Sequence, residues 1–210
     1  MPLIRKPAGA PSAGVPARNS AAVLLALASG TDDERWAAAR SAAELPGGVA
    51  AVAEALAREK SPRVREALFT GLARVATPQS VEVVLPFLRS DDALVRTGAS
   101  DALTAMRSVA WPAIAALLRD PDTDVRILAC SLVHDMPGET ALPLLCALLD
   151  SEPEPNVCAA AVDAIAEIGG AEALPVLVRC KERFAATPFL EFAIKVAMDR
   201  IRSQVTGPRA

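Results

Sequence analysis

Apolar residues recur at a helical spacing in a segment that appears several times along the chain. In residues 61–72 (SPRVREALFTGL) and just beyond, the apolar or small positions fall three or four residues apart: Val64, Ala67, Leu68, Gly71, Leu72 and Val75. This period predicts a helix with one buried stripe. Similar segments occupy 92–103, 122–133 and 154–165, and their shared valine falls at Val64, Val95, Val125 and Val157, at spacings of 31, 30 and 32 residues.

A second apolar segment precedes each of these helices, so each repeat is predicted to be a helix pair. We call the first helix of a pair helix A and the second helix B. Pro112, Pro143 and Pro175 occupy equivalent places in helix A, where the first helical turn tolerates a residue without an N–H. Glycine, proline, serine and threonine residues between the pairs predict the breaks.

Six pairs are predicted: 20–45, 48–76, 78–107, 109–136, 138–168 and 170–202. The predicted organisation is an N-terminal arm (1–19), an all-α repeat array (20–202) and a C-terminal tail (203–210). The arm holds three basic and no acidic residues with four prolines, so it is expected to be flexible; alternatively, Leu3–Lys6 docks on a partner or on the array.

The D-x-x-V-R pattern at the start of helix B, at this spacing and with proline early in helix A, resembles the bacterial HEAT-like repeat family over residues 20–202. The resemblance implies a right-handed α-solenoid with the B helices on its concave face. It also implies a structural role for an arginine ladder of Arg65, Arg96 and Arg126. The alternative is that this ladder binds an anion or reads a partner.

Composition supports the all-α prediction and narrows the function classes. Alanine supplies 44 positions, aromatics make up 3%, tyrosine is absent and there is one histidine, so common acid–base residues are scarce. The net charge of −3 argues against a nucleic-acid-binding surface. The absence of a long apolar run or signal sequence, and four cysteines without a Cys-x-x-Cys, favour a cytoplasmic protein with reduced thiols.

The outward side of the B helices is the predicted partner-binding surface. Offsets of +1, +5 and +9 from the shared valine form one row, and +2 and +6 form the row beside it. These rows are small and mildly polar. The candidate partner-binding residues are Glu66, Phe69, Thr70, Thr97, Ser100, Asp101, Thr104, Ser131, His134 and Asp163.

Two clusters of side chains, one of cysteine and histidine and one of phenylalanine, can each be interpreted in two ways. Cys130 and His134 lie four residues apart on this surface, and Cys158 lies in the next repeat. These three potential ligands are fewer than the four that zinc prefers. The favoured interpretation is therefore that the cysteines are buried apolar residues. A Phe184, Phe189 and Phe192 cluster in the last repeat is interpreted as core packing, with an exposed docking patch as the alternative.

No catalytic, cofactor-binding or metal-binding motif is found, so neither a cofactor nor enzymatic activity is expected. The favoured hypothesis is a scaffold or adaptor, monomeric or weakly dimeric, that binds another protein on the helix-B surface, in bacterial signalling or in the maturation of an enzyme complex. One alternative is an accessory enzyme or chaperone similar to the phycobilin lyases. A remote alternative is a HEAT-like DNA glycosylase, disfavoured because residues 20–210 carry 25 acidic and 19 basic residues.

Overall fold

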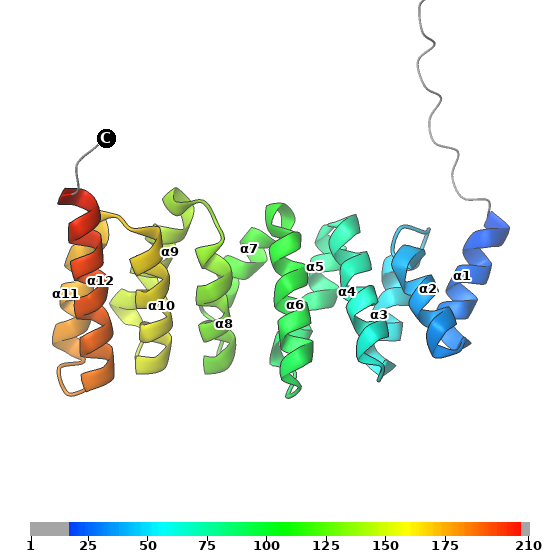
Figure 1. The fold of residues 1–210 in the computed structure, drawn as a ribbon, viewed down its shortest axis with the longest axis horizontal. Coiled ribbons are helices and arrows are strands. Elements are labelled where there is room, and N and C mark those ends of the chain that lie inside the picture. Colours follow the sequence, from blue (N-terminus) through cyan, green and yellow to red (C-terminus); the bar gives the residue numbers. More distant parts are fainter. Residues whose placement is uncertain (1–16, 207–210) are drawn as a thin grey trace, which may run out of the picture. The chain divides into compact units, whose positions relative to one another are not determined.

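The computed structural model describes residues 17–206, which form twelve α-helices and two short 3-10 helices without any strand (Figure 1). The helices follow one another as six pairs, as the repeated pattern predicts. Their bounds are α1 (Ala17–Ser29), α2 (Asp32–Ala42), α3 (Gly48–Arg58), α4 (Pro62–Val75), α5 (Pro78–Val84), η1 (Leu85–Arg89), α6 (Ala93–Ala105), α7 (Arg107–Leu117), α8 (Thr123–His134), α9 (Gly138–Ser151), α10 (Pro155–Ile168), η2 (Ala171–Ala173), α11 (Leu174–Arg183) and α12 (Pro188–Thr206).

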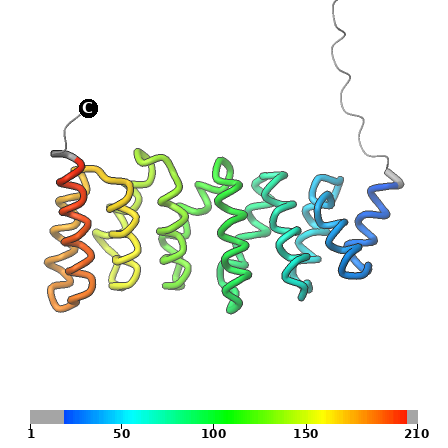
Figure 2. The backbone as a smooth tube through the Cα atoms, in the orientation of Figure 1, coloured from blue at the N-terminus to red at the C-terminus, as the bar shows by residue number. Residues whose placement is uncertain are grey.

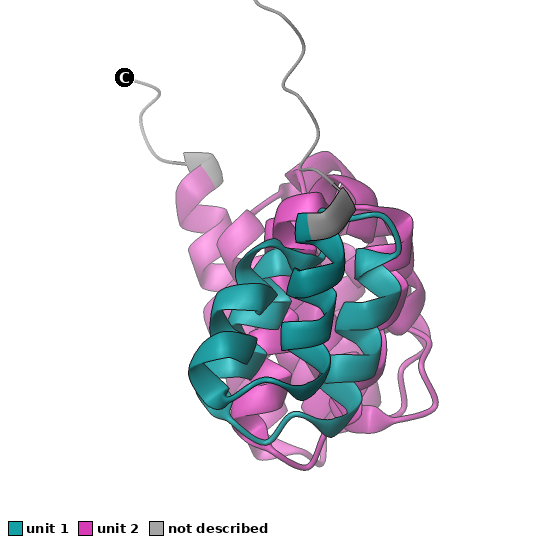
Figure 3. Cartoon of the chain, turned by 90° about the vertical axis from the view of Figure 1, so that its right-hand side faces the viewer, with its two compact units in different colours: residues 1–71 teal, residues 72–210 magenta. Residues whose placement is uncertain are grey.

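The chain divides into two compact units, residues 1–71 and 72–210, and the division falls inside α4 (Figure 3). In unit 1, α1 packs against α2 and α3. In unit 2, the B helices α6, α8, α10 and α12 succeed one another as one layer, and the A helices α7, α9 and α11 follow as a second layer (Figure 2). The sites described below all lie within one unit or the other.

Polar caps begin several of the helices. Asp92 and Asp122 accept hydrogen bonds from the backbone N–H groups of Leu94 and Asp124, at 2.9 Å each, and so start α6 and α8. Thr31 and Glu34 cap α2 reciprocally, because each side chain accepts a hydrogen bond from the other residue's backbone N–H. These caps bond N–H groups that have no partner inside the helix.

The core consists of the apolar stripe that the period predicts. In unit 2 the shared valines and the alanines four residues later are buried: Val95, Ala99, Val125, Ala129, Val157 and Ala161. In unit 1, Gly71 of α4 lies so close to α2 that an added Cβ would meet the carbonyl oxygen of Ala39 at 2.8 Å. Alanine and glycine therefore set the close approach of neighbouring helices.

Three boundary predictions need correction. Pro112 and Pro143 lie inside α7 and α9, because both helices begin five residues earlier than their proline; only Pro175 lies in a first turn. Residues 17–19, assigned to the arm, are helical in α1. Residues 203–206, assigned to the tail, continue α12. The rest of the arm, including Leu3–Lys6, and residues 207–210 lie outside the described residues.

Candidate functional site

The arginine that follows the shared valine holds the end of the preceding helix A. Arg96 donates from one guanidinium nitrogen to the carbonyl oxygens of Ser90 and Asp91, at 2.7 and 3.1 Å. Arg126 donates in the same way to the carbonyls of Asp120 and Pro121, at 2.8 and 3.2 Å. Because a helix leaves its last carbonyls without partners, this contact stabilises the turn between helices A and B.

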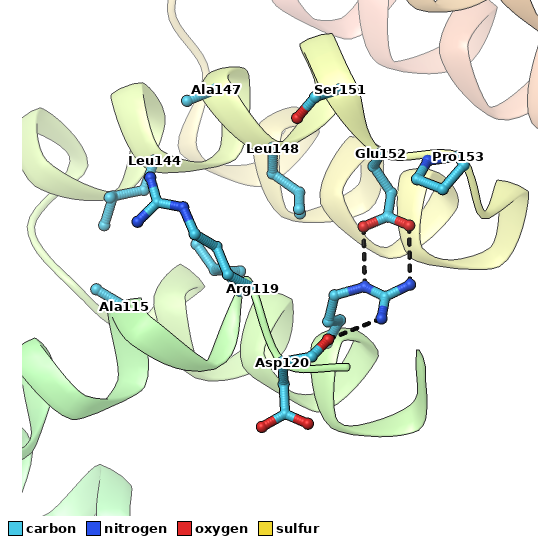
Figure 4. A pocket seen from close by; sticks show the side chains of 11 residues that line it. Ala115, Arg119, Asp120, Leu144, Ala147, Leu148, Ser151, Glu152 and Pro153 are labelled. Carbon is cyan, nitrogen blue, oxygen red and sulfur yellow. Dashed lines mark hydrogen bonds and ion pairs between the residues drawn. The ribbon is translucent and has the colours of Figure 1, made fainter. Parts of the chain in front are cut away.

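Arg126 also links its repeat to the next one through a buried ion pair. Its Nε and a terminal nitrogen donate to the two carboxylate oxygens of Glu152, at 2.9 Å each, beside a pocket of about 410 Å³ (Figure 4). The side chains are only 12% and 4% exposed, and the hydrogen bond from Arg126 to Glu152 raises the pKa of the guanidinium. The guanidinium is therefore committed to contacts within the chain.

Unit 1 holds an equivalent pair that the sequence pattern did not reveal. Arg35 donates to Glu59 at 2.8 and 3.1 Å and to the carbonyl of Gly30 at 2.9 Å. The hydrogen bond from Arg35 holds the pKa of Glu59 below its usual value. Arg35 follows no D-x-x-V motif, but it lies 30 residues before Arg65, so the repeat spacing was a signal that the motif alone missed.

The rows of the predicted partner-binding surface differ in exposure. Members of the +2 and +6 row are exposed: Glu66, Thr70, Thr97, Asp101, Ser131 and Asp163. In the +5 row, Phe69 is buried at 4% exposure, like Cys130 and Val162, so it cannot contact a partner and its assignment to that surface is wrong. The +5 position packs against neighbouring helices instead. Ser100, Thr104 and His134 are half-buried.

Several of the candidate residues line one groove of unit 2, between α6 and α8. The groove has a volume of about 360 Å³, and its lining includes Thr97, Ser100, Thr104, Ser131 and Asp135. Ser100 stands where α8 and α10 have the buried Cys130 and Val162. Ser100 is half-buried and presents a hydroxyl to the groove at this position.

Beyond the groove, the exposed surface of α8 and α10 is acidic. His134 Nε2 lies 3.0 Å from the carboxylate of Glu167, and Thr104 donates to Asp135 at 3.4 Å. Partial burial, and then the charge of Glu167, raise the pKa of Asp163. We define the helix-B face as the groove together with Asp101, Asp163, Glu167 and the exposed side of α12 described next.

The last B helix carries an apolar stripe. Phe189, Phe192 and Val196 of α12 are 51%, 69% and 49% exposed. The interpretation of Phe189 and Phe192 as core residues is therefore wrong, and only Phe184, which is half-buried beneath Arg183, is covered. The core positions of α12 are instead filled by Leu190, Ile194, Ala197, Met198 and Ile201.

The structure separates the histidine from the cysteines. Cys130 and Cys158 are fully buried, whereas His134 turns toward Glu167. Burial raises the pKa of the Cys130 thiol to about 12, and the pKa of Cys158 is also raised, first by its hydrogen bond with Cys180. Among residues 17–206, no group of three or more histidine, cysteine and acidic side chains could hold a metal ion.

One known protein family matches a large part of the chain. A family model for HEAT repeats matches residues 49–113 and 110–183, more than half of the chain. The chain belongs to the HEAT-repeat family. Family and structure agree on an all-α repeat fold of the solenoid class, a fold typical of protein-binding scaffolds. No curated protein matches this HEAT-repeat chain.

Solved structures with a similar fold are helical repeat proteins. The complex of CpcE and CpcF of phycocyanin lyase from Nostoc sp. PCC7120 is 19% identical, with 85% of this chain and 74% of that chain covered and a TM-score of 0.46. A designed armadillo repeat protein in complex with the peptide (KR)4 is 20% identical, with 85% and 98% covered and a TM-score of 0.43. At these identities the likeness concerns the fold alone.

None of the helices within residues 17–206 has the length and apolar character that a membrane-spanning segment requires.

Proposed function

We propose that this HEAT-repeat protein is a non-catalytic scaffold that binds another protein through the helix-B face of unit 2. The observation that carries the proposal is the groove between α6 and α8, where Thr97, Ser100, Thr104 and Ser131 come together. The exposed hydroxyls of Thr97 and Ser131 can exchange hydrogen bonds with a peptide backbone or with polar side chains. Ser100 and Thr104 already donate to the Arg96 carbonyl and to Asp135, so they can act only as acceptors for a partner. The groove's volume of about 360 Å³ accommodates a few residues of a partner.

The electrostatics of α10 also support the proposal. Asp163 is partly desolvated and lies near Glu167, and both effects disfavour its charged form. A partner that places a positive charge beside Asp163 would favour its ionised form.

We assign the arginine ladder a structural role rather than a role in partner contacts, although Arg96 also lines the groove. Arg96 and Arg126 donate to backbone carbonyls of their own repeat, and Arg126 also to Glu152. We therefore assign both a structural role, in which they hold the turns that position the B helices.

The experiment that tests the proposal is an affinity purification from the native organism with the full chain as bait. In the test variant Thr97, Ser131 and Asp163 are all replaced by Arg, which places bulky positive charge along the helix-B face. We expect the proteins retained by the natural sequence to be lost or reduced at least tenfold, because desolvated like charges across an interface cost several kcal/mol.

A matched variant controls for the added charge. Glu82, Ala116 and Ala147 are exposed positions on the A helices α5, α7 and α9, and their replacement by Arg adds a similar charge to the opposite layer. This variant should retain the same partners as the natural sequence. If both triple variants keep their partners, or if only the helix-A variant loses them, the proposed face is wrong.

A further inference from the structure

The apolar stripe on α12 points to one kind of partner segment. Phe189, Phe192 and Val196 are spaced three and four residues apart, so they share one side of the helix. We propose that this stripe, together with Asp163 and Glu167 of α10, binds an amphipathic helix of the partner protein. Apolar side chains of that helix cover the stripe, and its lysine or arginine residues contact the two carboxylates. This inference rests on the proposed function, because the stripe belongs to the same helix-B face.

The register of α12 against α10 places the stripe on that face. The two helices pack against each other, and a shift of 33 residues superposes their buried positions: Val157 on Leu190, Ala161 on Ile194, Ala164 on Ala197 and Ile165 on Met198. In this register Phe192 takes the place of Ala159, and Val196 takes the place of exposed Asp163. The stripe therefore continues the +2 and +6 row, with Asp163 on the adjacent helix.

The stripe lies on a different side of α12 from the one that corresponds to the stacking side of α10. In α10 the side that packs on the following repeat includes Cys158, whose thiol meets Arg183 of α11 at 4.0 Å, and the buried Val162 and Ala166. The matching positions of α12 are polar, and Lys195 and Asp199 are exposed. This side of α12 is thus polar, whereas its helix-B side is apolar.

The acidic residues on α10 determine which charge the partner helix should carry. Asp163 and Glu167 lie one turn apart on α10, and their mutual repulsion contributes to the raised pKa of Asp163. On α12, Arg200 occupies the position that matches Glu167, so a basic residue of the partner is best placed at Asp163, next to Val196. An acidic helix would meet like charge at the same point.

A helix from another protein fits this surface better than a second copy of the chain. From Phe189 to Val196 the stripe rises about 10 Å, two helical turns, which apolar residues at i, i+3 or i+4, and i+7 of a partner helix can cover. A second copy would bring Asp163 and Glu167 of one chain near the same carboxylates of the other, and these like charges would repel each other.

The probe for this inference is a fluorescein-labelled 14-residue peptide of leucine and lysine, with its leucines on one helical side. Its binding to the full chain is followed by fluorescence anisotropy. We expect saturable binding that weakens at least tenfold in Phe192→Ser and in Val196→Ser, because buried aromatic and aliphatic anchors dominate such interfaces. Asp163→Asn should weaken binding about threefold and reduce its salt dependence.

Leu94→Ser is the matched control, because Leu94 is an equally exposed apolar residue of unit 2, 72% exposed, at the start of α6. It should bind the peptide like the natural sequence. Circular dichroism of each variant checks that the exposed substitutions leave the helices intact.

Four outcomes would overturn the inference: no binding of the leucine–lysine peptide, equal binding of a leucine–glutamate peptide, unchanged affinity in Phe192→Ser, or a dimer of the natural sequence that Phe192→Ser dissociates in sedimentation velocity. None of these removes the proposed function, which depends on retention of natural partners and on the substitutions at Thr97, Ser131 and Asp163. Conversely, the affinity purification could show that the helix-B face does not bind the natural partners while the leucine–lysine peptide still binds. That result would contradict the proposed function without contradicting peptide binding by the stripe.

Discussion

Half-buried arginines tie successive repeats together in both units. Arg126 and Arg35 each donate twice to a glutamate at the end of the next helix A, Glu152 and Glu59, and each also donates to a carbonyl of its own repeat. Recurrence made Arg65, Arg96 and Arg126 recognisable from the sequence. The two glutamates could not be recognised from the sequence as partners of the arginines. Whether a carboxylate that follows helix A reaches the arginine depends on the path of the turn between helices A and B.

Removing Glu152 should destabilise the protein more than removing a comparable surface carboxylate. Glu152→Ala leaves the guanidinium of Arg126 buried without its partner, and we expect a loss of about 3 kcal/mol in the free energy of unfolding. Asp150→Ala breaks the exposed pair with Arg179, whose side chain is 55% exposed, and should cost at most about 1 kcal/mol. Urea unfolding followed by circular dichroism measures both; equal small losses would mean that the buried pair does not hold the repeats together.

The pair of Arg35 and Glu59 should make stability depend on pH. The pKa of Glu59 is lowered in the folded protein, so its ionised form adds stability above its unfolded pKa of about 4.3. This contribution is lost as the pH falls through the folded value. Glu59→Gln should therefore cost about 2 kcal/mol at pH 7, and the difference from the natural sequence should shrink below about pH 4.3.

Asp33→Asn provides the comparison, because Asp33 and Arg63 form a pair whose side chains are 86% and 57% exposed. Its effect on the unfolding free energy should stay within about 0.5 kcal/mol at either pH. A Glu59→Gln difference that stays constant from pH 7 to pH 3 would contradict the assigned ion pair.

The helices themselves were largely predictable, because a 3.6-residue apolar period needs only local sequence to be read. Which side of each helix is exposed and which is buried was harder to predict. Phe69 and Phe192 are both phenylalanines on a B helix, yet one is 4% and the other 69% exposed. The +5 position packs on neighbouring helices and the +2 position does not, and this difference depends on the rotation of each helix within the array.

The polar stacking side of α12 should keep the protein from associating end to end. Lys195→Val with Asp199→Ala gives α12 side chains like Val162 and Ala166 of α10, which pack on a following repeat. We expect this double variant to associate in a concentration-dependent manner in sedimentation velocity, because it exposes an apolar surface of repeat-packing shape. Gln79→Ala with Glu82→Val, two exposed positions on α5, should sediment like the natural sequence. Unchanged sedimentation of both variants would show that these polar residues do not cap the array.

At the scale of the whole chain, the repeated pattern was enough to predict an all-α array of six helix pairs and its membership of the HEAT-repeat family. The proposed binding surface was predictable only in part. Periodicity placed Thr97, Ser131 and Asp163 on the outward row, but the groove beside Ser100 and the apolar stripe of α12 depend on the side chains at single positions. A repeat pattern predicts the structure that all repeats share, whereas the proposed binding surface depends on positions at which the repeats differ.

The most direct test of the account is site-specific photo-crosslinking of the full chain in its native cells, because it reports which side of the helices touches a partner. A photoreactive phenylalanine analogue is placed at Ser131 or Asp163 on the helix-B face, and at Glu82 or Ala116 on the A helices. We predict that both helix-B positions yield the same discrete crosslinked partner and that the helix-A positions yield none. Crosslinks of equal strength on both sides, or on the A helices alone, would contradict partner binding by the helix-B face.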